Sequence, residues 1–149
     1  MRKRTRRKVR PAGHILTPKQ VERLTMPIYM ALELLPLGLF EECHAHDLAA
    51  CLSIAQVAAE DAGKSELVEI GAEGARTLIS MRDRARDGQG WVASDAERDV
   101  LSRAVGCIDR FYRTQNTARW CRALATVNAI SAAGRAAGQR PLDLAREGA

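Results

Sequence analysis

Aromatic residues are scarce in this chain of 149 residues, which contains two tryptophans, two tyrosines and two phenylalanines. The apolar fraction is nevertheless an ordinary 46%, and alanine, leucine, isoleucine and valine supply most of it. These side chains favour packed helices over sheets, where β-branched and aromatic residues are enriched. We therefore predict an all-α protein, of a length that suits one domain with a real hydrophobic core.

Long hydrophobic runs are also missing. No run of about 18 apolar residues occurs, and the basic start of the chain is not followed by the apolar stretch of a signal peptide. The cysteines lack the dense spacing of a disulfide-stapled secreted domain, and they stand at Cys43, Cys51, Cys107 and Cys121. We expect reduced thiols and a cytoplasmic protein.

Recognised catalytic motifs are absent from the sequence. It has no nucleophile elbow, no phosphate-binding glycine loop, no paired-carboxylate site and no His-Glu-x-x-His helix. Gly71 and Gly74 fall in the middle of a predicted helix, on its apolar stripe, where small residues allow a close helix crossing. We expect a protein that is not an enzyme and that needs no cofactor.

One cluster holds possible metal ligands: Cys43, His44, His46 and Asp47, with Cys51 nearby. On a helix Cys43, Asp47 and Cys51 share one face, but they spread over about 12 Å along the axis. The two histidines point elsewhere, and no second Cys or His pair follows. Buried thiols with histidines at the start of a helix explain this cluster better than a metal site does.

Acidic residues are missing from the first ten positions, which carry seven cations: Arg2, Lys3, Arg4, Arg6, Arg7, Lys8 and Arg10. The chain as a whole has 23 basic and 18 acidic residues, so the remainder has 16 basic and 18 acidic residues and a formal charge of −2. A flexible cationic arm neutralises phosphates whatever the base sequence, which favours DNA or RNA as partner. The alternatives are a solubilising tail and a tail that docks on an acidic protein.

A second basic cluster lies between residues 103 and 140, where seven arginines accompany the single acid Asp109. We expect Arg113, Arg119 and Arg122 to help the arm to bind nucleic acid, while a merely solvated helix face is the alternative. Trp120 and Tyr112 could stack on bases, but both lie on apolar stripes, which indicates core positions.

Capping and periodicity predict the helices. One helical arm should start with the capping box at Thr17 and run in two short pieces, because Pro27 restarts or kinks it. A central helix is expected over residues 41–62, another from Ser65, and a loop at residues 88–90. A long helical pattern then runs from Ser94 to about residue 137, with residues 115–117 as the place where it can break or change partner.

We therefore predict a four- to five-helix bundle, with a long C-terminal helix and a disordered basic N-terminal arm. The expected divisions are an arm over residues 1–16, a helical domain over 17–140 and a tail over 141–149. Self-association through the long helix is compatible with this fold.

The order of features over residues 1–60 resembles that of short helical proteins encoded in phages and prophages of proteobacteria. The resemblance is carried by the basic arm, Pro11-x-Gly13-His14, residues 16–20 (Leu-Thr-Pro-Lys-Gln) and Pro27-x-x-x-Ala31-Leu32. Some of those proteins look like Fis-type regulators, but residues 129–144 here lack two helices joined by a tight turn. The resemblance implies an accessory protein of a mobile element.

Two functions follow as expectations. In the first, the protein is a non-enzymatic accessory factor that binds nucleic acid electrostatically through its basic arm. In the second, it is a helical interaction module that binds a host or phage protein, as a regulator or inhibitor of host machinery, and the arm only accelerates encounter.

Overall fold

The computed structural model describes residues 13–136, and this part of the chain is helical almost throughout. Five α-helices and one π-helical turn follow one another: α1 (Pro18–Leu34), α2 (Glu42–Asp61), α3 (Ser65–Arg84), η1 (Ala85–Gln89), α4 (Asp95–Tyr112) and α5 (Thr117–Ala136). The extended pairing within residues 13–136 is limited to one bridge between Ile15 and Asn116. The prediction of an all-α protein is confirmed.

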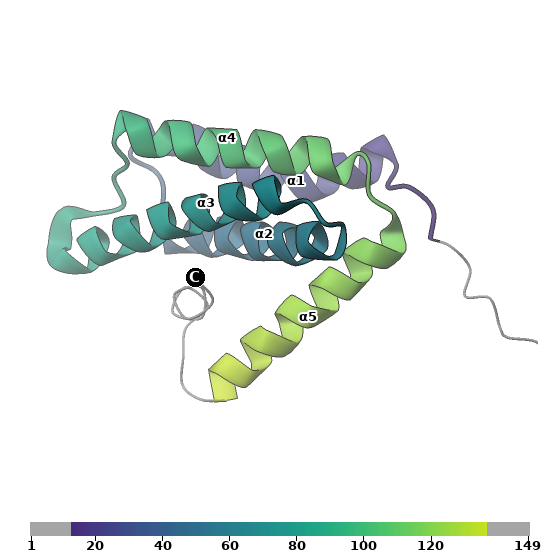
Figure 1. Ribbon diagram of the computed structural model, residues 1–149. Helices are drawn as coiled ribbons and strands as arrows, with labels where there is room; N and C mark the ends of the chain where they lie inside the picture. The colour runs from purple at the N-terminus through teal and green to yellow at the C-terminus, as the bar shows by residue number, and fades with distance from the viewer. Residues whose placement is uncertain (1–12, 137–149) are drawn as a thin grey trace, which may run out of the picture.

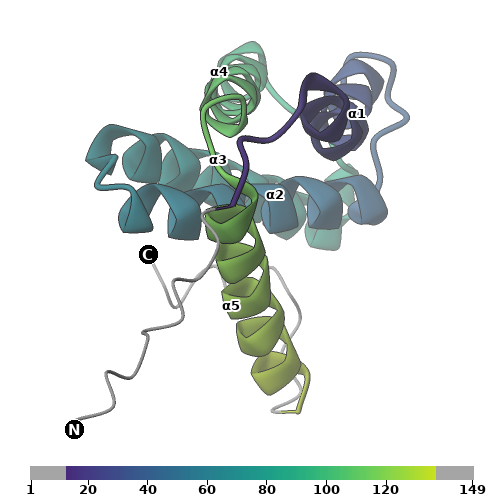
Figure 2. The ribbon, with the colours of Figure 1, turned by 90° about the vertical axis from the view of Figure 1, so that its right-hand side faces the viewer.

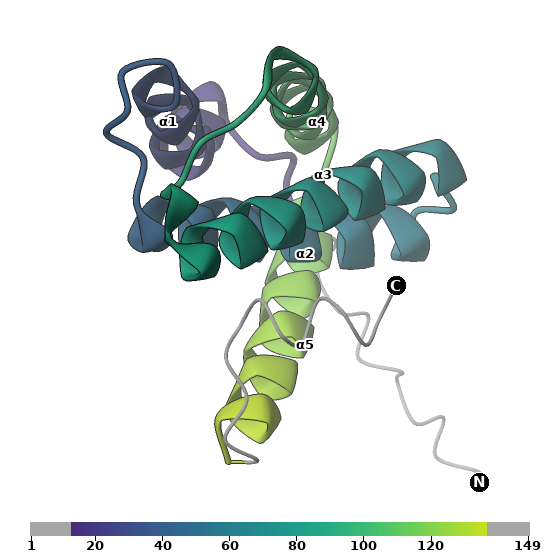
Figure 3. The ribbon, with the colours of Figure 1, turned by 90° about the vertical axis from the view of Figure 1, so that its left-hand side faces the viewer.

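Four of the helices form two crossed layers, and the fifth departs from them. α1 and α4 lie side by side above α2 and α3 (Figure 1). Figures 2 and 3 look along α1 and α4 from opposite ends, and α2 and α3 then run across the view. α5 packs on α2 and points away from the other helices. None of the helices in residues 13–136 has the length and apolar character needed to cross a membrane.

α2 is the central helix, as its apolar residues predict. It contacts each of the other four α-helices. Its buried residues include Leu48 and Leu52, both 1% exposed. Small residues bring α3 close to it, because a Cβ atom at Gly71 would lie 2.6 Å from Cγ of Gln56, and one at Gly74 would lie 3.2 Å from a methyl group of Leu52. The two glycines therefore permit the close helix crossing that the sequence indicated.

α1 is a single helix, so the expectation of two short pieces is wrong. The predicted capping box at Thr17 is present. Pro27 lies inside the helix on its exposed side, and the buried face continues past it from Val21 to Ile28. The Cys51 thiol also approaches the Leu24 carbonyl, with 3.9 Å between sulfur and oxygen. Burial on both sides of the proline outweighs the hydrogen bond that proline removes.

The predicted long C-terminal helix is divided into α4 and α5, so it is not continuous. The break falls at the polar residues 115–117 that the sequence indicated. Asn116 caps α5, because its side-chain oxygen accepts from the Arg119 N–H at 2.8 Å. Thr114, just before this run, donates its hydroxyl hydrogen to the Phe111 carbonyl at 2.8 Å. At the start of α4, Ser94 and Glu97 form the predicted capping box. The break turns α5 off the axis of α4, which gives the apolar faces of the two helices different partners.

Candidate nucleic-acid interface

The described chain begins at the joint between α4 and α5. A Cβ atom on Gly13 would lie 2.8 Å from the Thr117 hydroxyl oxygen, so the backbone passes very close to α5. The Thr117 N–H donates to the His14 carbonyl at 2.8 Å, and the Leu16 N–H donates to the Gln115 carbonyl at 2.9 Å. Leu16 is buried. The last four residues of the predicted arm are therefore attached to the helical body at this joint.

The seven cations of the predicted arm lie outside the described residues: Arg2, Lys3, Arg4, Arg6, Arg7, Lys8 and Arg10. The twelve residues before Gly13 can span at most about 40 Å, because an extended residue spans about 3.3–3.6 Å. Connectivity thus keeps every one of these cations within reach of the α4–α5 joint.

Arg119 and Arg122 lie on α5 and share one carboxylate at the end of α2. Both guanidinium groups donate to Oδ2 of Asp61, each over 3.0 Å. The hydrogen bond from Arg119 and then that from Arg122 hold the pKa of the Asp61 carboxyl below its ordinary value. Arg119 also donates to the Gln115 side-chain oxygen at 2.8 Å. Two of the three predicted helper arginines thus attach α5 to α2 and leave one positive charge in excess.

Arg113 lies at the α4–α5 joint and belongs to a different group. Its guanidinium is 3.1 Å from Oδ1 of Asp109, one helical turn earlier. The Tyr29 hydroxyl of α1 donates to Oδ2 of Asp109 at 3.0 Å. Burial, followed by the hydrogen bond to Asp109, raises the pKa of Tyr29. The sequence did not reveal this contact, because Tyr29 and Asp109 are 80 residues apart.

No acidic residue occurs between residues 110 and 136, which end α4 and form α5. This stretch carries five arginines: Arg110, Arg113, Arg119, Arg122 and Arg135. The structure brings Arg113, Arg119 and Arg122 to the joint and to the first turns of α5, whereas Arg135 lies near the far end of that helix. The predicted helper arginines therefore stand beside the root of the arm.

Tyr112 and Trp120 are core residues, as their positions on apolar stripes indicated. Tyr112 is 1% exposed, and Trp120 is partly buried against the core with its indole nitrogen covered. The Tyr112 hydroxyl lies 4.0 Å from the Cys51 sulfur, and burial raises the pKa of both groups, to about 11 for Cys51. These two aromatic rings are not placed to stack on bases.

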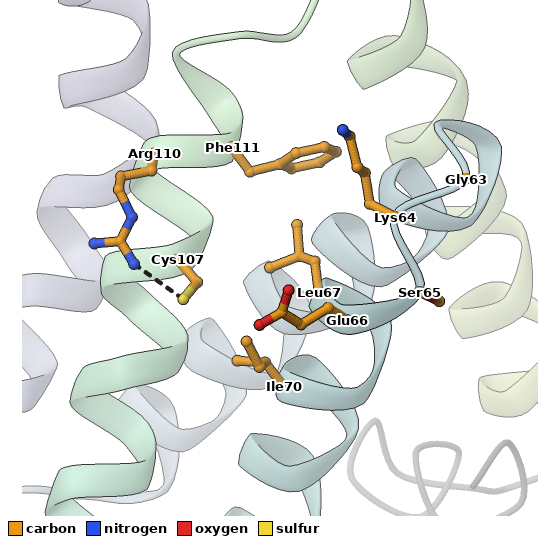
Figure 4. Close-up of a pocket in the computed structure, with 9 residues that line it drawn as sticks. All are labelled: Gly63, Lys64, Ser65, Glu66, Leu67, Ile70, Cys107, Arg110 and Phe111. Carbon is orange, nitrogen blue, oxygen red and sulfur yellow. Dashed lines mark hydrogen bonds between the residues drawn. The ribbon is translucent and has the colours of Figure 1, made fainter.

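A pocket of about 470 Å³ lies between the start of α3 and the end of α4 (Figure 4). Leu67, Ile70 and Phe111 form its apolar lining. Its polar groups have both signs, because Lys64 and Arg110 line it together with Glu66. The Cys107 sulfur accepts a hydrogen bond from Arg110 at 3.1 Å. Sequence reasoning missed this pocket, although the spacing of Cys107 and Arg110 on one helix face was a visible signal.

The cysteine and histidine cluster at the start of α2 does not gather around one point. Cys43 is exposed, whereas Cys51 is partly buried and faces Tyr112. The His44 Nδ1 atom accepts a hydrogen bond from the Glu41 N–H at 2.9 Å. Within residues 13–136 no three side chains of His, Cys, Asp or Glu come together in a way that could hold a metal ion. All four cysteines are free thiols.

No protein-family model, no curated protein and no solved structure matches this chain. Inference about its function consequently depends on its own residues and on the way the fold brings them together.

Proposed function

We propose that the protein binds the phosphate backbone of nucleic acid, without reading bases, as an accessory protein of a phage or another mobile element. The observation that carries the proposal is the attachment of residues 13–16 to the α4–α5 joint. Residues 13–16 lie on the side of the body where Arg113, Arg119 and Arg122 lie, and the ten residues that carry the seven cations precede them closely in the sequence.

The charge distribution makes the arm the main contact. Residues 13–136 carry 14 basic and 16 acidic residues, so the described body has a formal charge of −2 and does not attract polyanions as a whole. The arm adds +7 at one place. Cations that neutralise phosphates release counterions, and this gain does not depend on the base sequence. The acid-free α5 extends the cationic surface from the root of the arm.

The described residues offer few side chains that could read bases. Arg119 and Arg122 are already oriented by Asp61, and the rings of Tyr112 and Trp120 are in the core. Direct readout needs side chains that present hydrogen-bonding groups to base edges in a groove. Phosphate contacts alone position a protein on nucleic acid but carry no sequence information.

Fluorescence anisotropy with labelled duplex and single-stranded DNA and RNA tests the proposal. The variants are one chain with the seven arm cations changed to Gln and one with residues 2–10 in scrambled order, which keeps all seven charges. We expect the neutral arm to lose binding and the scrambled arm to retain it. Retained binding by the neutral arm would overturn the proposal. Loss of binding by the scrambled arm would exclude binding by the charge of the arm alone.

The contribution of the joint is tested separately. Arg113→Gln should weaken binding modestly and equally for all base sequences, because it removes one cation beside the arm. Arg86→Gln is the matched control, since it removes an exposed cation from η1. Equal effects of the two substitutions would limit the interface to the arm.

A second candidate function is interaction with another protein. It is favoured by apolar side chains on the surface of α1 and of the loop that follows it, where Met26, Met30, Leu37 and Leu39 are all about half exposed or more. Met26 and Met30 line one groove, and contiguous exposed apolar surface on a small protein often marks a contact surface.

A further inference from the structure

The acidic and basic residues of this chain are segregated along the sequence. Residues 24–63 contain no Lys or Arg but six acids: Glu33, Glu41, Glu42, Asp47, Glu60 and Asp61. Residues 110–136 show the reverse pattern, with five arginines and no acid. The two segments already meet once inside the molecule, where Asp61 binds Arg119 and Arg122. Charge complementarity between the α1–α2 region and α5 is therefore a property of this chain.

Three acids near the end of α1 and the start of α2 have no basic partner among the described residues. Within the described residues no Lys or Arg pairs with Glu33, Glu41 or Asp47. The far end of α5 shows the converse, because no acid of residues 13–136 pairs with Arg135. α5 extends from the layer of α2 and α3 on the side opposite to α1 and α4 (Figure 2).

An apolar groove runs along α1 and ends beside these acids. It has a volume of about 570 Å³, and its lining includes Met26, Pro27, Met30 and Leu34 from α1, with His44 and Asp47 from α2. Met26 and Met30 are 49% and 60% exposed. Lys19, Glu22 and Arg23 line the other end, so that end carries one more basic than acidic side chain, whereas Asp47 lines the opposite end. Methionine-rich grooves of this kind accept apolar helix faces.

The far half of α5 is a helix whose apolar residues have few partners. Leu124 and Val127 are partly buried on the core, but farther along Ile130 is 50% exposed. Of the twenty residues of α5, only Ala123 and Gly134 are buried. A short helix with so little packing is marginally stable in water, because most helical stability in proteins comes from tertiary contacts.

We infer that residues 128–136 of α5 from a second copy of the chain occupy the groove on α1. The groove is long enough, since nine helical residues span about 14 Å and the sixteen residues from Lys19 to Leu34 span about 24 Å. Ile130 of one copy lies on Met26 and Met30 of the other. The direction follows from charge, because Arg135 faces Asp47 in one orientation and Lys19 in the reverse one.

The contact joins two different surfaces, so a reciprocal exchange between two copies closes it as a dimer. The far end of α5 of each molecule then lies in the groove of the other, while the start of α5 stays on its own α2, and the contact is made twice. Two such contacts bury about twice the surface area of one, and specific dimers bury roughly 1,200–2,000 Å² in total. Closure also leaves no free groove, whereas one-way insertion would build an open chain of molecules.

Sedimentation of the full-length protein over a wide concentration range, with three matched substitutions, tests the inference. Met30→Glu places a carboxylate in the groove, and Ile130→Glu places one on α5. Each should weaken dimerisation at least about tenfold, because a buried unpaired charge is costly. Val92→Glu is the control, since Val92 is equally exposed but lies between α3 and α4, and it should leave the dimer intact. Circular dichroism checks that every variant remains helical.

Mixing the two defective variants gives the decisive result. Met30→Glu retains a normal α5 and Ile130→Glu retains a normal groove, so their mixture should form a heterodimer through one intact contact. An α5-to-α5 interface predicts no recovery on mixing and no effect of Met30→Glu, and that pattern would overturn the inference. A wild-type chain that stays monomeric would overturn it as well. Removing residues 1–10 should leave the dimer unchanged, so failure of this inference is distinguishable from failure of nucleic-acid binding.

Discussion

Gly71→Ala is a test of the close crossing between α2 and α3. Gly71 is buried in the middle of α3, and an added methyl group would lie 2.6 Å from Cγ of Gln56. Real contacts to a Cβ atom are longer than this, so either Gln56 or the two helices must move. Gly106→Ala in α4 makes the same chemical change in a helix interior, but there the methyl group meets one atom, the end of the Arg110 side chain, at 3.7 Å.

The expected effects differ in sign. Replacing a helical glycine by alanine stabilises a protein by about 0.5–1 kcal/mol when there is room for the methyl group. Gly106→Ala should show this gain. Overpacking of a close-packed contact costs about 1–3 kcal/mol, which exceeds that gain. Gly71→Ala should therefore lower the free energy of unfolding by about 1 kcal/mol.

Urea denaturation followed by circular dichroism measures both effects. A double-mutant cycle identifies the cause: in a Gln56→Ala background the obstructing side chain is gone, so Gly71→Ala should become neutral or stabilising. If Gly71→Ala stabilises the wild-type chain as much as Gly106→Ala does, the crossing is not as close as described.

Three further predictions concern the thiols and one helix cap. Burial raises the pKa of the Cys51 thiol from 9.0 to about 11, so the folded state disfavours the thiolate. The free energy of unfolding should therefore fall by up to about 3 kcal/mol as the pH rises from about 9 to about 11. Cys51→Ala should flatten this fall in a series of denaturation curves at different pH. Thiol reagents should modify the exposed Cys43 and Cys121 quickly and the partly buried Cys51 more slowly, and mass spectrometry of the labelled peptides would contradict this if Cys51 were labelled at the same rate. Ser94→Ala removes the hydroxyl that accepts the Glu97 N–H and should lower stability by about 1 kcal/mol, whereas an unchanged melting temperature would mean that the cap contributes nothing.

Local sequence signals predict most of the secondary structure of this protein. The capping boxes at Thr17 and Ser94 start helices where expected, and Gly63, with a φ of 69°, ends α2. Gln115 and the two residues after it were the one polar run in a long helical pattern, and the helix breaks there. These features succeed because each depends on residues within one turn of the chain.

Long-range contacts explain what the sequence did not predict. Pro27 indicated two helical pieces, but burial of Ile28 behind it keeps α1 whole. The roles of Arg119 and Arg122 depend on Asp61, which is about 60 residues away in the sequence. The attachment of residues 13–16 beside Gln115 is equally invisible in a local pattern.

The site was predictable in its charges but not in its geometry. The seven arm cations and the acid-free stretch after residue 110 can be counted in the sequence. The attachment of residues 13–16 at the α4–α5 joint, beside Arg113, required the fold. The attachment of α5 to α2 by two of the arginines through Asp61 required it as well.

The salt dependence of nucleic-acid binding is the most direct test of the proposed function. Each phosphate contact lowers the slope of log Kobs against log salt by about 0.9 on duplex DNA, so seven arm contacts give a slope near −6 for the full chain. Changing the seven arm cations to Gln should remove most of this slope together with the affinity. Binding that is absent at low salt, or a slope that the neutral arm leaves unchanged, would contradict the proposed function.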